Sequence, residues 1–366
     1  MKTIVISAVN IRRGGTLTIL KQCLAYLSSE APVRQWRIVA IVHKKALCDY
    51  QHIEYIEMPE VAQSWGRRLW CEYVTMHRIS KQLAPVDLWF SLHDTSPRVH
   101  AQRQAVYCQT SFPFLKWKLQ DLRFDPKIVL FTLFTRFAYR INIHANYRLV
   151  VQADWLRQGF SKMFRLPSSK FIVSPPQKPE LKEIPNIEKT TTYQFFFPST
   201  PDCHKNFELA CQAAALLEQE IGNDKFRLVI TVQGDENKYA KWLHGKWGAT
   251  DSICFAGYLS KEQLYKTYAQ SDCLVYPSRV ETWGLAISEF GILNKPCLIA
   301  DMPYAHETAA GNNLVAFFNA DNPYDLKEKM RAMLQQQHAI LAPVPQRIHE
   351  QPIAENWESL FRSLLE

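Results

Sequence analysis

The sequence predicts an α/β protein with two parallel-sheet domains. Short apolar segments alternate with helical stretches in both halves of the chain, as in doubly wound sheets. The length of 366 residues exceeds what one hydrophobic core usually supports. Residues 174–192 separate the two halves, because they are rich in proline, lysine, glutamate and threonine and show no hydrophobic period.

The first domain is predicted at residues 1–175. Its apolar strands are expected at 3–9, 37–42, 87–92, 104–108 and 148–152, with helices at 15–28, 66–83, 114–123 and 127–143. After a linker at 176–192, the second domain is predicted at 193–350. Its strands are expected at 193–198, 226–232, 252–256, 272–276 and 296–300, with helices at 205–220, 236–244, 260–269, 283–293 and 323–336. The apolar spacing within 351–366 predicts a last helix.

The composition excludes several classes of protein. No run of about twenty apolar residues predicts a membrane-spanning helix. The strand at 3–9 is too short and too β-branched for a signal peptide, so we expect a cytoplasmic protein. Nine cysteines without a C-x-x-C pair indicate neither a zinc site nor a redox motif, and we expect no metal. The twelve glycines contain no G-x-G, and the chain has no Walker A or H-E-x-x-H motif, which argues against a conventional dinucleotide-binding enzyme.

The net charge of +8 favours an anionic partner, which could be nucleic acid, an acidic membrane surface or a phosphorylated substrate. The basic residues are dispersed and no nucleic-acid-binding motif is present, so nucleic acid is the least supported of the three.

Two glutamates flank a glycine at a strand-to-helix junction in residues 277–291. Glu281 precedes the predicted helix, Gly284 lies at its start and Glu289 lies inside it. Amides at a helix start favour phosphates, and carboxylates accept hydrogen bonds from hydroxyls. A ligand with central phosphates and hydroxyl-rich ends is a nucleotide sugar. The alternative is a capping box at Ser278–Glu281, with Glu289 as a solvated helix residue.

The spacing of Glu281 and Glu289 resembles the signature of the retaining glycosyltransferases of family 4. Further motifs follow in that family's order, namely Gly14-Gly15, His204-Lys205-Asn206, residues 253–260 and residues 303–307. The resemblance implies the GT-B fold, in which two Rossmann-like parallel-sheet domains face a central cleft and the last helix packs back on the first domain. It also implies a UDP- or GDP-sugar as donor substrate, with no cofactor and no metal.

The resemblance assigns roles to individual residues. Lys205 would contact the donor phosphates, Glu281 the donor sugar and Glu289 the ribose hydroxyls. The remaining donor-binding positions would be Gly14, Gly15, Gly234, Tyr258, Leu259, Trp283, Gly284 and Leu285. For the first two glycines the alternative is an ordinary tight turn, and for Lys205 a solvated charge.

Two family positions are changed in this chain. The arginine that often precedes the lysine is absent from residues 198–202, and Arg279, or Arg12 with Arg13, could replace it unless each is simply solvated. Gln109 stands where the family commonly carries a histidine near the reacting carbon. Glutamine cannot act as a base near neutral pH. His93 could supply an imidazole instead, or it could be a surface histidine.

Residues 112–140 are dense in aromatic side chains interleaved with lysine and arginine. They could form a patch on the anionic inner membrane surface that meets a lipid-linked acceptor. Helices packed on the first sheet would show much the same pattern.

The predicted function is retaining transfer of a sugar from a nucleotide-diphosphate sugar to a cell-surface glycan acceptor, such as a lipopolysaccharide or capsule precursor. The alternatives are an inverting transferase or nucleotide-sugar epimerase of the same fold, and a non-catalytic GT-B subunit that binds nucleotide sugar or a partner.

Overall fold

Two parallel sheets organise the chain and confirm the predicted fold class. The computed structural model describes residues 1–176, 192–347 and 349–366, so the linker predicted at 176–192 lies almost wholly outside them. The first unit comprises Met1–Thr110, Phe134–Gln177 and His349–Glu366, and the second comprises Ser111–Leu133 and Lys178–Ile348. In the described ranges, no helix is both long and apolar enough to cross a membrane.

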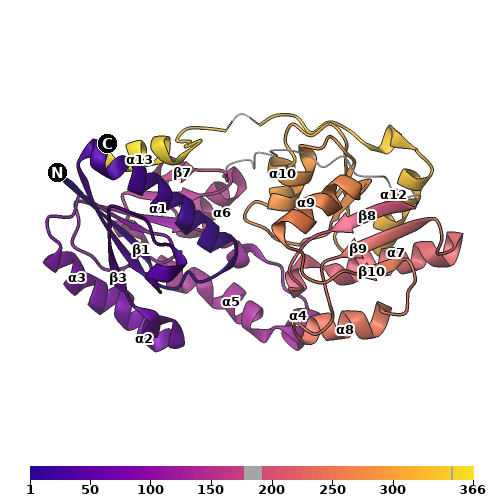
Figure 1. Cartoon of the computed structure of the whole chain (residues 1–366), viewed down its shortest axis with the longest axis horizontal. Helices are drawn as coiled ribbons and strands as arrows, with labels where there is room; N and C mark the ends of the chain where they lie inside the picture. The colour runs from indigo at the N-terminus through magenta and orange to yellow at the C-terminus, as the bar shows by residue number, and fades with distance from the viewer. Residues whose placement is uncertain (177–191, 348) are drawn as a thin grey trace. The chain divides into compact units, whose positions relative to one another are not determined.

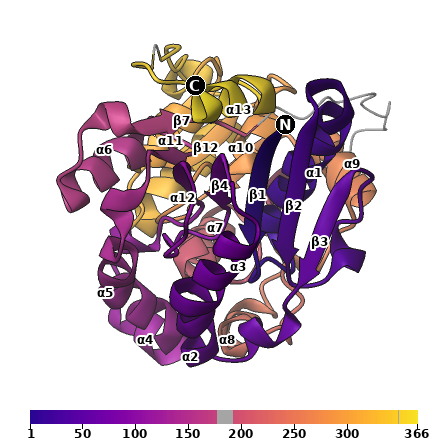
Figure 2. The same ribbon diagram turned by 90° about the vertical axis from the view of Figure 1, so that its left-hand side faces the viewer.

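The first unit contains a seven-stranded sheet in the order β3-β2-β1-β4-β5-β6-β7, whose first four strands can be followed in Figure 2. The strands are β1 (Lys2–Ala8), β2 (Trp36–Val42), β3 (Ile53–Glu57), β4 (Leu88–Ser91), β5 (Arg103–Cys108), β6 (Arg148–Val151) and β7 (Phe171–Val173). Its helices are α1 (Gly14–Arg34), α2 (Trp65–Trp70), α3 (Met76–Gln82), α6 (Asp154–Phe164) and α13 (Trp357–Leu365), while α5 (Pro126–Arg140) begins in the second unit.

Both faces of this sheet are covered by helices. Since alternate residues of a strand point to opposite faces, one strand contributes side chains to two separate cores. Ile4 and Ile6 of β1 belong to the core that also includes Leu24 of α1 and Phe361 of α13. Val5 belongs to a second core with Cys71, Met76 and Trp89. Figure 1 shows α1 and α13 on one side of the strands and α2 and α3 on the other. The last helix is therefore part of the first unit.

The second unit contains a six-stranded sheet in the order β10-β9-β8-β11-β12-β13. Its strands are β8 (Tyr193–Phe197), β9 (Phe226–Ile230), β10 (Ile253–Phe255), β11 (Cys273–Tyr276), β12 (Cys297–Ala300) and β13 (Val315–Phe318). Its helices are α4 (Leu119–Phe124), α7 (Phe207–Ile221), α8 (Lys238–Trp247), α9 (Lys261–Gln270), α10 (Leu285–Gly291), α11 (Pro303–Thr308) and α12 (Pro323–Leu334).

Residues 111–133 were assigned to the first domain by the sequence, but they pack within the second unit. The guanidinium of Arg279 donates to the carboxylate of Asp121 with both terminal nitrogens. The Phe124 ring lies 5.0 Å from the Trp242 ring of α8, between ring centroids. These contacts join residues more than a hundred positions apart, which is why strand and helix periodicity alone misplaced the segment.

Candidate functional site

The loop between β11 and α10 carries the glutamate motif. Gly284 adopts φ +93° and forms the N-cap of α10, which begins at Leu285 rather than at the predicted residue 283. A side chain at this φ would be strained, so glycine is favoured here. Because α10 begins four residues after Glu281, the capping-box alternative for Ser278–Glu281 is wrong. Glu281 is therefore free of that backbone role.

Glu281 and Lys205 form an ion pair at the carboxyl ends of β8 and β11. The Lys205 ammonium lies 2.7 Å and 2.9 Å from the two carboxylate oxygens of Glu281. The Tyr276 hydroxyl, at the last residue of β11, donates to the same carboxylate at 2.9 Å. Burial, and then the Glu281 charge, hold the pKa of Tyr276 well above its usual value. The sequence predicted both charged residues, and the structure brings them together.

The loop that positions Lys205 is fixed from two sides. Asn206 adopts the left-handed conformation, and its side-chain amide donates to the carbonyl oxygens of Pro277 at 3.1 Å and Ala320 at 2.9 Å. The neighbouring His204 is buried, and burial followed by the Lys205 and Arg279 charges holds its pKa well below the usual value. The His204 ring is therefore a neutral packing group beside Lys205.

Arg279 does not replace the cation that is missing before Lys205. Its side chain is buried and its terminal nitrogens bind Asp121 and the Cys203 carbonyl oxygen. Burial opposes its charge, but the hydrogen bond and charge of Asp121 outweigh that effect and raise the pKa of Arg279. We therefore correct the expectation that Arg279 could contact the donor phosphates directly. Arg279 instead holds residues 203–205 against α4.

Glu289 lies on α10 and is half-buried. Its carboxylate accepts a hydrogen bond from the Tyr268 hydroxyl of α9 at 2.8 Å. Burial raises the pKa of Glu289, and the Tyr268 hydrogen bond only partly offsets this effect. The tyrosine was not singled out from the sequence, although its place in a helix preceding β11 could have suggested it. The pair holds the Glu289 carboxylate in one orientation.

The other predicted donor-binding residues of the second unit differ in exposure. Trp283 is buried, and its indole nitrogen donates to Ser288 Oγ at 2.8 Å. Tyr258 is 88% exposed and Leu285 is 43% exposed, whereas Leu259 is half-buried. Gly234 follows β9 with φ +110°, and its amide donates to Glu236 at 2.8 Å. The Trp283 ring is therefore engaged in a contact with α10.

In the first unit, His93 is not an accessible imidazole. Its Nε2 lies 2.8 Å from Ser7 Oγ and its Nδ1 lies 3.0 Å from Thr95 Oγ1. Burial lowers the pKa of His93 to about 4, so the ring is neutral near pH 7. Both alternatives raised from the sequence, a reactive imidazole and a surface histidine, differ from this buried position.

Gln109 makes an internal contact, whereas Gly14 and Gly15 border open space. The Gln109 side-chain amide donates to the Leu92 carbonyl oxygen at 2.6 Å, and its Oε1 is buried without a hydrogen-bond partner. Gly14 adopts φ +70° at the start of α1, and neither Gly14 nor Gly15 has an atom within 4 Å of the Cβ position. The space beside both glycines is therefore open. Among the described residues, no cluster of three His, Cys, Asp or Glu could hold a metal ion.

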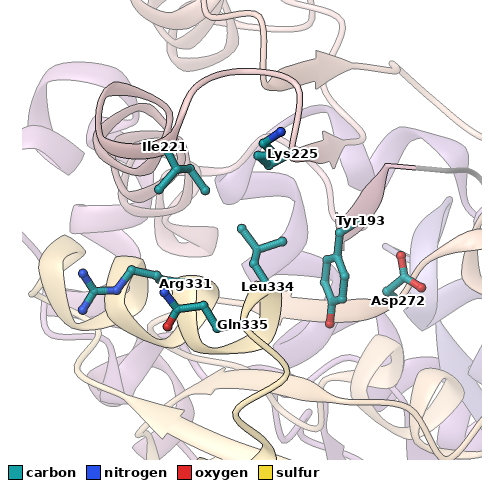
Figure 3. Close-up of a pocket in the computed structure, with 7 residues that line it drawn as sticks. All are labelled: Tyr193, Ile221, Lys225, Asp272, Arg331, Leu334 and Gln335. Atoms are coloured by element: carbon teal, nitrogen blue, oxygen red, sulfur yellow. The ribbon is translucent and has the colours of Figure 1, made fainter.

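A separate hollow of about 410 Å³ lies at the amino ends of the second sheet's strands. It is lined by Tyr193, Ile221, Lys225, Asp272, Arg331, Leu334 and Gln335 (Figure 3). Arg331 pairs with Glu220, and Lys225 pairs with Asp224. Ligands of open parallel sheets bind beyond the carboxyl ends, where Glu281 lies. The hollow is therefore not the donor site.

Comparisons with known proteins agree with this architecture. Residues 177–351 match the family model described as Glycosyl transferases group 1. A glycosyltransferase from Rickettsia africae is 13% identical, with 92% of this chain and 89% of that chain covered and a TM-score of 0.63. WaaG, a glycosyltransferase involved in lipopolysaccharide biosynthesis, is 16% identical, with 93% of each chain covered and a TM-score of 0.62.

HepE from Anabaena in complex with UDP-glucose is 14% identical, with 93% of this chain and 92% of that chain covered and a TM-score of 0.59. No curated protein matches the sequence. At these identities the structural likeness establishes the fold, which is that of the GT-B glycosyltransferases.

Proposed function

We propose that this protein is a retaining, metal-independent glycosyltransferase that moves a sugar from a nucleotide-diphosphate sugar to a cell-surface glycan acceptor. The observation that carries the proposal is the Lys205–Glu281 pair at the carboxyl ends of β8 and β11, within the region that matches the group 1 model. A relative of the same fold holds UDP-glucose, which supports a nucleotide sugar as the donor.

The residues suggest how the donor is held. A donor diphosphate and Glu281 are both anions, so each can pair with the Lys205 ammonium. When the diphosphate takes the ammonium, the Glu281 carboxylate is released to accept hydrogen bonds from the sugar. Glu289, oriented by Tyr268, would accept hydrogen bonds from the ribose hydroxyls.

The transfer step needs no protein base in this proposal. The bond between the anomeric carbon and the diphosphate breaks while the acceptor oxygen bonds to the same face of that carbon. The leaving phosphate oxygen takes the acceptor proton, and Lys205 stabilises the negative charge that develops there. This route fits a chain in which Gln109 replaces the family histidine and His93 is buried.

A panel of UDP, GDP, ADP and CMP sugars tests the proposal. We expect one donor to raise the melting temperature and to release free nucleotide when lipid-linked acceptors are supplied, also in EDTA. Glu289→Ala should abolish most of the donor-induced shift, whereas Glu262→Ala, an exposed glutamate of α9, should keep it. An unchanged shift in Glu289→Ala would refute the ribose assignment.

The same panel separates the alternatives. The buried Arg279 and the glutamine at 109 favour a non-catalytic GT-B subunit as the second candidate. Donor binding without nucleotide release from any donor would favour that subunit. Conversion of the donor to an isomer would indicate an epimerase, and an inverted anomeric configuration in the product would indicate an inverting transferase.

A further inference from the structure

Residues 116–133 expose apolar side chains at the surface of the second unit. Leu119 is 80% exposed, Leu122 49% and Leu130 55%. Trp117 and Leu133 are also exposed. Single exposed leucines are common, but several exposed apolar side chains within eighteen residues are of the kind that marks an interaction site.

The exposed charges within this segment are positive. Among residues 116–133, all of which the structure describes, the exposed charged residues are Lys116, Arg123 and Lys127. The two acidic residues of the segment serve internal contacts, since Asp121 binds Arg279 and Asp125 accepts a hydrogen bond from the Ile128 amide at the start of α5. The exposed charge of the segment is therefore wholly basic.

Helix α8 extends the basic surface. The Phe124 ring of α4 packs against Tyr239 and Trp242 of α8, so the two helices are neighbours, as Figure 1 shows. Lys238, Lys241 and Lys246 of α8 are exposed, and α8 contains no acidic residue. Apolar side chains thus lie on a surface that carries six exposed basic residues and attracts anions.

The segment is firmly attached on its inner side. Asp121 and Phe124 face the second unit, while Leu119, Leu122 and Arg123 face outward, as the helical period of α4 requires. A further ion pair joins the Lys118 ammonium to Asp321 at 2.7 Å. The outward leucines are therefore displayed by a fixed element rather than by a loose loop.

We propose that residues 116–133 and α8 form a docking surface for an anionic lipid bilayer. Exposed leucine and tryptophan beside lysine and arginine match the interface between acyl chains and acidic headgroups. A second copy of this chain fits less well, because its own basic surface would repel the first. The inference rests on the proposed function only for the acceptor, which the bilayer would present as a lipid-linked glycan.

Vesicle co-sedimentation of the full chain tests this surface. The probes are phosphatidylcholine vesicles with and without phosphatidylglycerol. One variant combines Leu119→Glu with Leu122→Glu, and a second combines Arg123→Glu with Lys127→Glu. The matched control is Ile340→Glu, an exposed apolar residue elsewhere in the same unit. Circular dichroism and the donor-induced melting shift confirm that each variant is folded.

We expect wild type and the control to bind only the vesicles that contain phosphatidylglycerol, and less tightly at high salt. Each basic residue near such a surface contributes about fivefold to binding, so the double reversal should weaken binding by about 25-fold or more. The leucine variant should weaken it by at least about tenfold.

Three results would overturn the inference. The first is that wild type does not bind the vesicles, and the second is that both double variants bind them as tightly as wild type. The third is that wild type forms a dimer that the same variants abolish. Vesicle binding without any donor-induced shift would leave the docking surface intact and contradict the proposed function instead.

Discussion

The buried Arg279–Asp121 pair predicts a large loss of stability when one partner is removed. The side chains are 5% and 1% exposed, so Arg279→Ala leaves the Asp121 carboxylate inside the protein without its cation. Removing one partner of a buried pair typically costs about 3–5 kcal/mol. In a unit of about 200 residues, each kcal/mol lowers the melting temperature by roughly 2–4 °C, so we expect a decrease of roughly 10 °C.

Two further variants make the reasoning falsifiable. Arg331→Ala removes an arginine of the same unit whose ion pair with Glu220 lies at the surface, and it should leave the free energy of unfolding close to that of wild type. Combining Asp121→Leu with Arg279→Met removes both charges and should recover most of the stability. Urea unfolding followed by tryptophan fluorescence measures each free energy. The reasoning fails if Arg279→Ala costs under 1 kcal/mol, or if the double variant is as unstable as the single one.

Two other predictions concern local structure. Gly234→Ala should destabilise the second unit by about 1–3 kcal/mol in the same urea assay, because the residue has φ +110° and its Cβ would lie 2.8 Å from His244 Cβ. The control is Gly245→Ala in α8, whose Cβ would meet no atom within 4 Å. This change should stabilise the unit by up to about 1 kcal/mol. His93 has a folded pKa of about 4, below its unfolded value of 6.5, so the unfolded chain binds the proton first as the pH falls. Up to about 3 kcal/mol is therefore lost between about pH 6.5 and pH 4, and His93→Gln should flatten that part of the stability curve; an unchanged slope would contradict the lowered pKa.

Most of the fold followed from hydrophobic periodicity, and the misses have local causes. The edge strand β3 contains Glu54 and Glu57, so it lacks the continuous apolar run of the central strands. Strands β7 and β13 and helices α6 and α11 were also not predicted. The predicted helix 66–83 is interrupted by a π-helical turn at Cys71–Thr75, which periodicity does not detect.

The candidate site was predictable where its residues lie close to a motif and not where it depends on distant contacts. Glu281, Lys205 and Glu289 were found from short motifs, and the structure adds Tyr276 and Tyr268 as their partners. The partner of Arg279 could not be found in this way, since Asp121 lies 158 positions away. Nothing in the sequence distinguished a buried arginine from one that faces a ligand.

The return of residues 111–133 to the second unit has a consequence for how the chain can be divided. A fragment that begins at residue 192 would leave Arg279 without Asp121 and would uncover Tyr239 and Trp242. Chimeras that exchange the second unit between proteins of this fold must therefore carry both pieces of the chain. During synthesis on the ribosome, Asp121 emerges long before its partner, so this unit cannot reach its final packing until translation has passed Arg279.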